Sequence, residues 1–194
     1  MKIGGFVPFT TIDYPGMLSA VIFTQGCPWR CGYCHNTHLQ DFHIKPTLPW
    51  ERVLTFLKSR QSLLEAVTFS GGEPTLQTDL LEAICEIREL GFKIGLHTAG
   101  ISLLKLQKVL PFIDWIGMDI KAPFDNYKKI TGVFRSGKEP LLCAKAVIAS
   151  GIPYQFRTTV DPNLLSEKDI QTITKQIKEL GGTEPIWQKV RYKT

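Results

Sequence analysis

Three cysteines within eight residues are the strongest chemical signal in the sequence. Cys27, Cys31 and Cys34 form a C-x3-C-x2-C pattern, and only two further cysteines are present. A group this tight does not fit a disulfide framework and is typical of a set of metal ligands. A [4Fe-4S] cluster normally takes four cysteines, so three leave one iron open to bind a substrate. The alternative is a structural zinc ion, completed by His35 or His38.

A second loop bears on that choice. The turn Ser70-Gly71-Gly72-Glu73-Pro74 follows an apolar run that predicts a strand. Adjacent glycines let a ligand approach the backbone closely, and their carbonyls together with the Glu73 carboxylate are acceptors suited to an ammonium group. A phosphate-binding loop would supply donors and a following Gly-Lys-Ser/Thr, which is missing. The alternative is an ordinary tight turn with no ligand. The occurrence of this turn together with the cysteine loop favours an iron–sulfur cluster over a zinc ion.

The elements that must position these loops alternate between strands and helices. Amphipathic helices are indicated by apolar residues at the 3.6 period, with glycines just past helical runs at 91, 151 and 181 and a capping box at Ser166 and Asp169. The periodic positions are Leu80, Leu81, Ile84, Ile87 and Leu90, then Ile170, Ile173, Ile177 and Leu180. Predicted strands cover 20–25, 66–70, 93–98, 115–120, 154–160 and 185–190.

Six such units predict an α/β fold, a partial (β/α)6 TIM-like barrel with parallel strands. The chain ends soon after the sixth strand, so a barrel of eight units is not expected. Ligands of parallel α/β folds bind at the carboxyl ends of the strands, where both loops lie. We expect one domain over residues 1–194, in which 1–18 form an N-terminal segment.

Composition narrows the class of protein. The 194 residues are 43% hydrophobic and 21% charged, as in a globular protein, and the net charge of +5 is spread along the chain, which does not indicate nucleic-acid binding. No run approaches the ~18 apolar residues of a membrane span, and the N-terminus lacks the apolar core of a signal peptide. We therefore expect a cytoplasmic protein with no membrane partner.

The cysteine loop, with Tyr33 before its last cysteine, and the turn 71–74 resemble the radical S-adenosylmethionine (SAM) superfamily. More narrowly, the chain is similar to activating proteins of anaerobic ribonucleoside-triphosphate reductase, relatives of pyruvate formate-lyase activating enzyme. The segments that carry this resemblance are IDYPG (12–16), FTQGC (23–27), YCHN (33–36), HTAG (97–100), MDIKA (118–122) and RTTV (157–160). They extend over nearly the whole chain.

The resemblance implies a set of site residues. Cys27, Cys31 and Cys34 hold one [4Fe-4S] cluster per chain, whose open iron chelates SAM. Tyr33 lies against the adenine. The methionine ammonium is received by Gly71, Gly72 and Glu73, while Thr98, Asp119 and Lys121 lie near the methionine carboxylate or sulfonium, and Arg157 reaches the carboxylate or the ribose. The alternative for Asp119 and Lys121 is a surface ion pair at a strand end.

Three further features are interpreted as structural or left open. His97 stands where related activases often have an acidic residue. This difference argues against a cation bound beside the methionine carboxylate. We interpret His97 as a hydrogen-bonded structural residue. Cys85 and Cys143 are expected to be buried core thiols. Residues 124–137 form a long connection, either a rim for a partner peptide or a solvated loop.

The function implied by the resemblance is reductive cleavage of SAM to a 5′-deoxyadenosyl radical, which generates a glycyl radical on a partner enzyme. The expected partner is anaerobic ribonucleotide reductase, with reduced flavodoxin or ferredoxin as electron donor. Two alternatives stay open: a radical SAM enzyme acting on a small molecule, similar to 7-carboxy-7-deazaguanine synthase, and a non-catalytic zinc-binding module.

Overall fold

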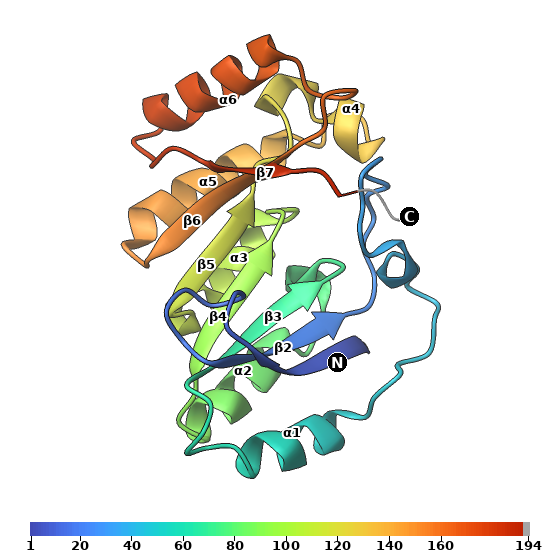
Figure 1. Ribbon diagram of the computed structural model, residues 1–194, viewed down its shortest axis with the longest axis vertical. Coiled ribbons are helices and arrows are strands. Elements are labelled where there is room, and N and C mark those ends of the chain that lie inside the picture. The colour runs from blue at the N-terminus through green and yellow to red at the C-terminus, as the bar shows by residue number, and fades with distance from the viewer. Residues whose placement is uncertain (192–194) are drawn as a thin grey trace.

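The computed structural model describes residues 1–191 and contains a seven-stranded sheet in the order β1-β2-β3-β4-β5-β6-β7 (Figure 1). Strand β1 pairs with β2 in the antiparallel direction, and each later strand is parallel to its neighbour. The strands are β1 (Ile3–Thr10), β2 (Ser19–Thr24), β3 (Ala66–Gly71), β4 (Lys93–Thr98), β5 (Trp115–Asp119), β6 (Tyr154–Val160) and β7 (Ile186–Lys189). The predicted partial barrel is confirmed, and residues 192–194 of the predicted domain lie outside the described part.

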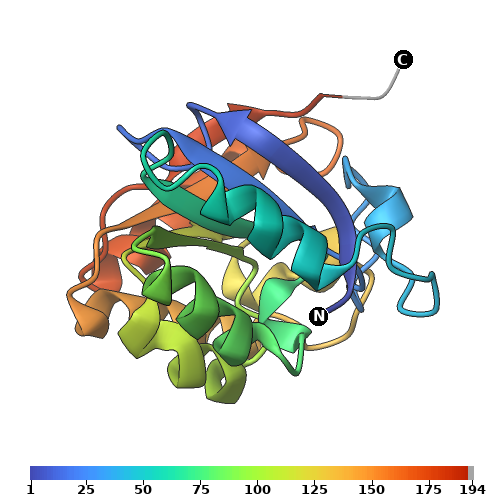
Figure 2. The same cartoon turned by 90° about the horizontal axis from the view of Figure 1, so that it is seen from below.

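The helices lie along the outer side of the curved sheet (Figure 2). The main hydrophobic core fills the space between sheet and helices, and the predicted stripes lie in it: Ile84, Ile87, Ile173 and Ile177 are fully buried. Among residues 1–191, no helix is long and apolar enough to cross a membrane. The helices are α1 (Trp50–Lys58), α2 (Leu80–Glu89), α3 (Leu103–Val109), α4 (Lys128–Thr131), α5 (Lys138–Ser150) and α6 (Glu167–Glu179).

Several helix ends lie where local sequence signals predict them. Gly91, Gly151 and Gly181 all have positive φ, at 89°, 69° and 79°, as expected of residues that terminate helices. Helix α6 begins with the predicted capping box, in which the Ser166 hydroxyl accepts from the Asp169 N–H and the Asp169 carboxylate accepts from the Ser166 N–H. These caps satisfy backbone groups that would otherwise lack partners.

Strand β1 was not predicted. Its sequence IGGFVPFT contains two glycines and a proline, which weaken any strand signal, and its pairing with β2 is interrupted by two register shifts. Pro8 is tolerated because β1 is an edge strand, where one side of the backbone needs no ladder partner. The N-terminal segment is therefore part of the sheet and not an appendage to it.

The loop 11–18 between β1 and β2 crosses the inner face of the sheet, the face opposite the helices. Figure 1 shows it in blue in front of β4. Tyr14 is 5% exposed and packs with Ala66 and Trp115, its ring 5.7 Å from that of Trp115. The Asp13 carbonyl oxygen accepts hydrogen bonds from Thr68 Oγ1 at 3.4 Å and from the His97 ring at 3.0 Å. The chain thus covers part of its own inner face.

Two expectations need correction. The connection 124–137 is not a solvated loop throughout, because it contains a 3-10 turn (Phe124–Asn126) and helix α4, and Phe124, Tyr127 and Ile130 are buried in the core. Cys143 is fully buried as expected, whereas Cys85 is only partly buried. Its position on α2 lies beside the buried stripe and not within it.

Removing the Tyr14 side chain should destabilise the protein, because Tyr14 fills the space over Ala66 and Trp115 on the inner face. We expect Tyr14→Ala to lower the free energy of unfolding by about 3 kcal/mol in urea titrations of the cluster-free protein. Ile12→Ala is the control in the same loop: this side chain is 87% exposed, so its loss should change stability by no more than about 0.5 kcal/mol. Equal effects of the two variants would contradict a packing role for the loop.

Candidate functional site

A cavity of about 790 Å³ opens at the carboxyl ends of the strands. Ten of the eleven residues predicted for the site line it, so the structure brings together segments that are far apart in the sequence. Glu73 is the exception. The ten are Cys27, Cys31, Tyr33, Cys34, Gly71, Gly72, Thr98, Asp119, Lys121 and Arg157.

Backbone hydrogen bonds hold the cysteine loop from two sides. On one side, the N–H groups of Gly26 and Cys27 donate to the carbonyls of Leu39 and Gln40 at 2.8 and 3.0 Å. On the other side, the Arg30 N–H donates to a carbonyl of α4, that of Thr131, at 3.0 Å. All three cysteines of the loop are partly buried free thiols. The surrounding chain therefore holds the backbone of the loop at its start and in its middle.

The two glycines of the turn after β3 let that turn touch the cysteine loop. Gly71 has a φ of 106°, a left-handed conformation that favours glycine. A Cβ on Gly72 would overlap the Gly26 carbonyl oxygen, and the Glu73 N–H donates to that same oxygen at 2.9 Å. The sequence suggested that these glycines admit a ligand. The structure shows that they also admit the neighbouring loop.

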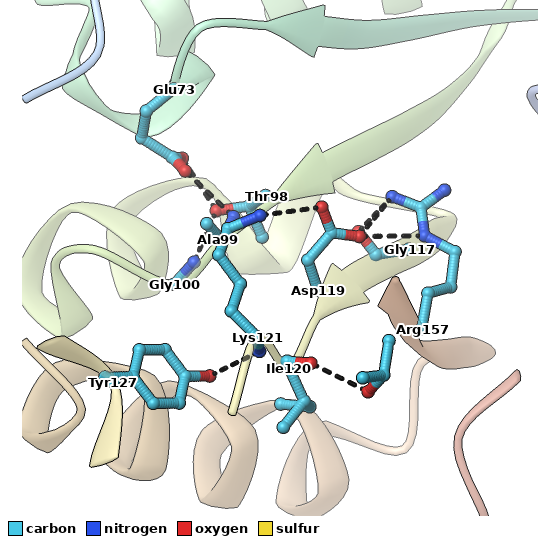
Figure 3. Close-up of polar contacts among 11 residues, drawn as sticks. Glu73, Thr98, Ala99, Gly100, Gly117, Asp119, Ile120, Lys121, Tyr127 and Arg157 are labelled. Atoms are coloured by element: carbon cyan, nitrogen blue, oxygen red, sulfur yellow. Dashed lines mark hydrogen bonds and ion pairs between the residues drawn. The ribbon is translucent and has the colours of Figure 1, made fainter. Parts of the chain in front are cut away.

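The Glu73 side chain has partners other than the predicted ammonium group. It is fully buried, and its Oε1 accepts from the Thr98 hydroxyl at 2.6 Å (Figure 3). Oε1 also accepts from the Thr75 hydroxyl at 2.7 Å, while Oε2 accepts from the Ala99 N–H at 2.9 Å. Burial raises the pKa of Glu73, and these hydrogen bonds oppose the rise. The carboxylate joins the glycine turn to the end of β4.

Asp119 lies between two cations at the end of β5. Its register partner on β6 is Arg157, whose Nη2 lies 3.0 Å from Oδ1, and Lys121 Nζ lies 3.4 Å from Oδ2 (Figure 3). Burial alone would raise the pKa of Asp119, but the charges of Arg157 and Lys121 outweigh it and hold that pKa below the usual range. Burial disfavours the charged form of Lys121, yet Asp119 raises the pKa of that lysine well above its ordinary value. Two cations facing one anion leave a net positive charge here.

Aromatic residues connect this charged group to the cysteine loop. The Lys121 N–H donates to the Tyr127 hydroxyl at 3.1 Å, and the Tyr127 ring meets that of Trp29, within the cysteine loop, at 5.9 Å. Lys121 Nζ also lies 5.9 Å from the centre of the Tyr33 ring. Tyr127 is 1% exposed, so this link is part of the core. The interpretation of Asp119 and Lys121 as a solvated surface pair does not fit these contacts.

His97 lines the cavity and is neutral at physiological pH. Burial, together with the charge of Arg157, lowers its pKa to about 3. Its Nε2 lies 3.0 Å from the Asp13 carbonyl oxygen, which can only accept, so Nε2 carries the proton and Nδ1 is left as an acceptor. The expected structural hydrogen bond is present, and it fastens loop 11–18 to β4.

The donor set fits an iron–sulfur cluster. Burial raises the pKa of Cys27 to about 11 and also raises that of Cys31, so thiolates here require a cationic partner. Within residues 1–191, no three His, Cys, Asp or Glu side chains converge closely enough for a single metal ion. Cysteines of a cluster bind different irons and can lie further apart, whereas a tetrahedral zinc ion needs its ligands together.

A partial barrel with three free cysteines and a charged cavity at the carboxyl ends of its strands defines a cofactor-dependent enzyme of the iron–sulfur type. The chain belongs to the radical SAM superfamily, whose family model matches residues 21–181. Membership implies a [4Fe-4S] cluster and SAM, and Cys27, Cys31 and Cys34 are the cysteines available to hold the cluster.

Relatives are found among activating enzymes. The chain is 32% identical over 188 residues to a Methanocaldococcus jannaschii protein named as a glycyl-radical enzyme activating enzyme, covering 91% of this chain and 75% of that one. It is 32% identical over 182 residues to the pyruvate formate-lyase-activating enzyme of Clostridium pasteurianum, covering 90% and 75%.

Solved structures match the fold. The crystal structure of Streptococcus suis SuiB bound to S-adenosylmethionine aligns with a TM-score of 0.70 at 18% identity, covering 90% of this chain. This chain spans only 41% of the SuiB chain, so the likeness concerns the barrel.

Several cavity residues were missed from the sequence. Ser70 and Ala99 lie within the quoted turn 70–74 and segment 97–100, so the motifs could have indicated them. Ile12 lies in the IDYPG segment, but only the crossing of loop 11–18 over the inner face brings it to the cavity. The last strand and the two residues after it belong to no quoted motif, although they contribute Gln188, Lys189, Val190 and Arg191.

A methyl group at Gly72 should displace the cysteine loop, because the atoms it would meet belong to the backbone of that loop and cannot rotate away. We expect Gly72→Ala to cost about 1–3 kcal/mol of stability and to lower the iron retained per chain after anaerobic reconstitution. Gly5→Ala is the matched control, since the nearest atom to its Cβ lies 3.6 Å away. Normal iron content in Gly72→Ala would show that the close approach is unnecessary.

The depressed pKa of His97 predicts a specific loss of stability in acid. The ordinary pKa is 6.5 and the folded-state value is about 3, so between these values only the unfolded chain binds the proton. Stability therefore falls as the pH drops below 6.5. From pH 7 to pH 5 the cluster-free wild type should lose about 2 kcal/mol more than His97→Gln in urea titrations, because glutamine donates to Asp13 without titrating. Parallel pH profiles for the two proteins would contradict the buried neutral histidine.

Proposed function

We propose that the protein is an activase that generates a glycyl radical on a partner enzyme. The observation that carries the proposal is the single cavity in which three free cysteines meet the group of Asp119, Lys121 and Arg157. Activating enzymes among the relatives, each matched over about 90% of this chain, support the same reaction. The cluster and SAM, when bound, supply the one-electron cleavage that yields methionine and a 5′-deoxyadenosyl radical.

The cavity residues are suited to hold SAM in a fixed orientation. Lys121 and Arg157 outnumber Asp119, so this side of the cavity favours the methionine carboxylate. The carbonyls of Gly71 and Gly72 are acceptors for the ammonium group, while Glu73 acts in the proposal mainly by holding that turn in place. Tyr33, which lines the cavity beside Lys121, offers an apolar face to the adenine.

The chain must also keep water away from the radical and admit the partner's glycine. Loop 11–18 covers the part of the inner face near Ala66 and Trp115, and the cavity opens at the carboxyl ends of the strands. The partner's glycine would enter there, and its α-carbon hydrogen atom would be transferred to the radical that bound SAM supplies, which would leave the glycyl radical on the partner. Positioning and exclusion of solvent are the contributions of the protein to this step.

The partner we propose is anaerobic ribonucleotide reductase, with one [4Fe-4S] cluster per activase chain. Support comes from the segments IDYPG, FTQGC and YCHN, which resemble activating proteins of that reductase. Reduced flavodoxin or ferredoxin is the proposed electron donor. A small-molecule reaction similar to that of 7-carboxy-7-deazaguanine synthase is the competing outcome of the test below.

The test is anaerobic reconstitution followed by electron paramagnetic resonance. We expect about four iron and four sulfide ions per chain, cleavage of SAM under dithionite, and a glycyl radical doublet when the reductase is added. Cys31→Ala should abolish all three results. Cys85→Ala, which changes a cysteine outside the cavity, should leave them intact.

Two outcomes would overturn the proposal. A colourless zinc-containing protein would remove the radical chemistry altogether. Cleavage of SAM without a glycyl radical on the reductase or on pyruvate formate-lyase, together with turnover of a heterocyclic substrate, would favour the small-molecule enzyme.

A further inference from the structure

A basic surface lies on the outside of the cysteine loop. We call it the outer basic surface. Its exposed side chains come from the cysteine loop, from α4, from the turn after α4 and from the first residue of α5, and they are Arg30, Lys128, Lys129, Phe134, Arg135 and Lys138. In the described part of the chain none of the six lines the cavity. Phe134 is 71% exposed and carries the Arg135 guanidinium 5.2 Å above its ring, so the surface includes one exposed apolar ring beside a charge.

The outer basic surface carries most of the net positive charge. Residues 124–138 contain four basic residues and one acidic residue, and Arg30 is a fifth base, so 18 basic and 17 acidic residues remain for the rest of the chain. Lys129 is paired with Asp169 at 3.1 Å. For the other four bases, no carboxylate within residues 1–191 lies at ion-pair distance. The charge is therefore available to a partner.

Direct contacts join this surface to the backbone that holds the cysteines. The N–H groups of Arg30 and Gly32 donate to the α4 carbonyls of Thr131 and Ile130, at 3.0 and 3.3 Å. Arg30 lies between two of the cysteines in sequence, and its Nη1 donates to the Cys27 carbonyl at 2.7 Å. Figure 1 shows α4 beside the blue cysteine loop. A protein bound here is separated from the thiols mainly by the cysteine loop itself.

We propose that the outer basic surface docks an acidic one-electron carrier protein that reduces the cluster. The inference rests on the proposed function, in which SAM and the partner's glycine occupy the cavity, so the electron must enter through another face. The reduced carrier loses one electron to the bound cluster, and no bond or proton is exchanged. Opposite charges steer encounters of this kind. Electron-transfer interfaces are small and weak, and a charged surface with one exposed apolar ring is suited to such an interface.

The test uses reconstituted protein and flavodoxin as the acidic carrier. Lys128→Glu/Arg135→Glu should weaken binding of oxidised flavodoxin and slow cluster reduction by flavodoxin hydroquinone by about tenfold or more at low ionic strength. The difference should largely vanish at about 0.5 M salt. Lys58→Glu/Lys93→Glu, which makes the same charge change on exposed lysines elsewhere, should change both quantities less than about twofold. Iron content and reduction by dithionite should match wild type in both variants.

If both double variants weakened flavodoxin binding equally, binding would depend on the net charge of the protein, and the assignment to the outer basic surface would be overturned. Unchanged binding and reduction in Lys128→Glu/Arg135→Glu would overturn it as well. Failure of the proposed function is distinguishable, since it appears as absence of a glycyl radical in wild type reduced by dithionite, where no carrier takes part. Binding of flavodoxin is measured without turnover and reports on the surface alone.

Discussion

The site depends on the close approach of two backbone segments. These are the glycine turn after β3 and the cysteine loop after β2. Strands β2 and β3 are parallel neighbours, so their loops leave the sheet side by side. Gly72 has no side chain to separate them, and the Gly26 carbonyl accepts the Glu73 N–H. Because the Glu73 carboxylate then bonds to Thr98 and Ala99, the loops after β2, β3 and β4 form one connected unit.

The register of the sheet places the charges next to that unit. Asp119 and Arg157 are register partners on β5 and β6, so their ion pair follows from strand alignment and not from flexible side chains reaching across a surface. Lys121 is held by its own backbone, whose N–H bonds to buried Tyr127. A cation-rich group fixed in this way needs little rearrangement to receive an anion, and preorganisation of this kind is how a rigid site gains affinity.

Much of this arrangement could be predicted from the sequence. Strands β4 and β6 and the caps of α6 carry strong local signals. The cysteines and the glycine turn could be recognised from their residue types, and the family resemblance implied the other residues of the ten that line the cavity. Strand β1 could not be predicted, because its two glycines and Pro8 weaken the local strand signal. It forms a strand through its pairing with β2, which a local pattern does not show. The partners of Glu73 and the position of the last strand beside the cavity depend on long-range packing, which no local pattern contains.

The open barrel gives the two ends of its inner face different roles. Loop 11–18 covers the part near the starts of β3 and β5, where Tyr14 meets Ala66 and Trp115, and the bond between His97 and Asp13 ties that cover to β4. What stays open is the carboxyl end, where the charged residues and cysteines lie. The cysteine loop then has the cavity on one side and α4 on the other. The proposed glycyl radical partner and the proposed electron carrier would therefore approach the same loop from different sides.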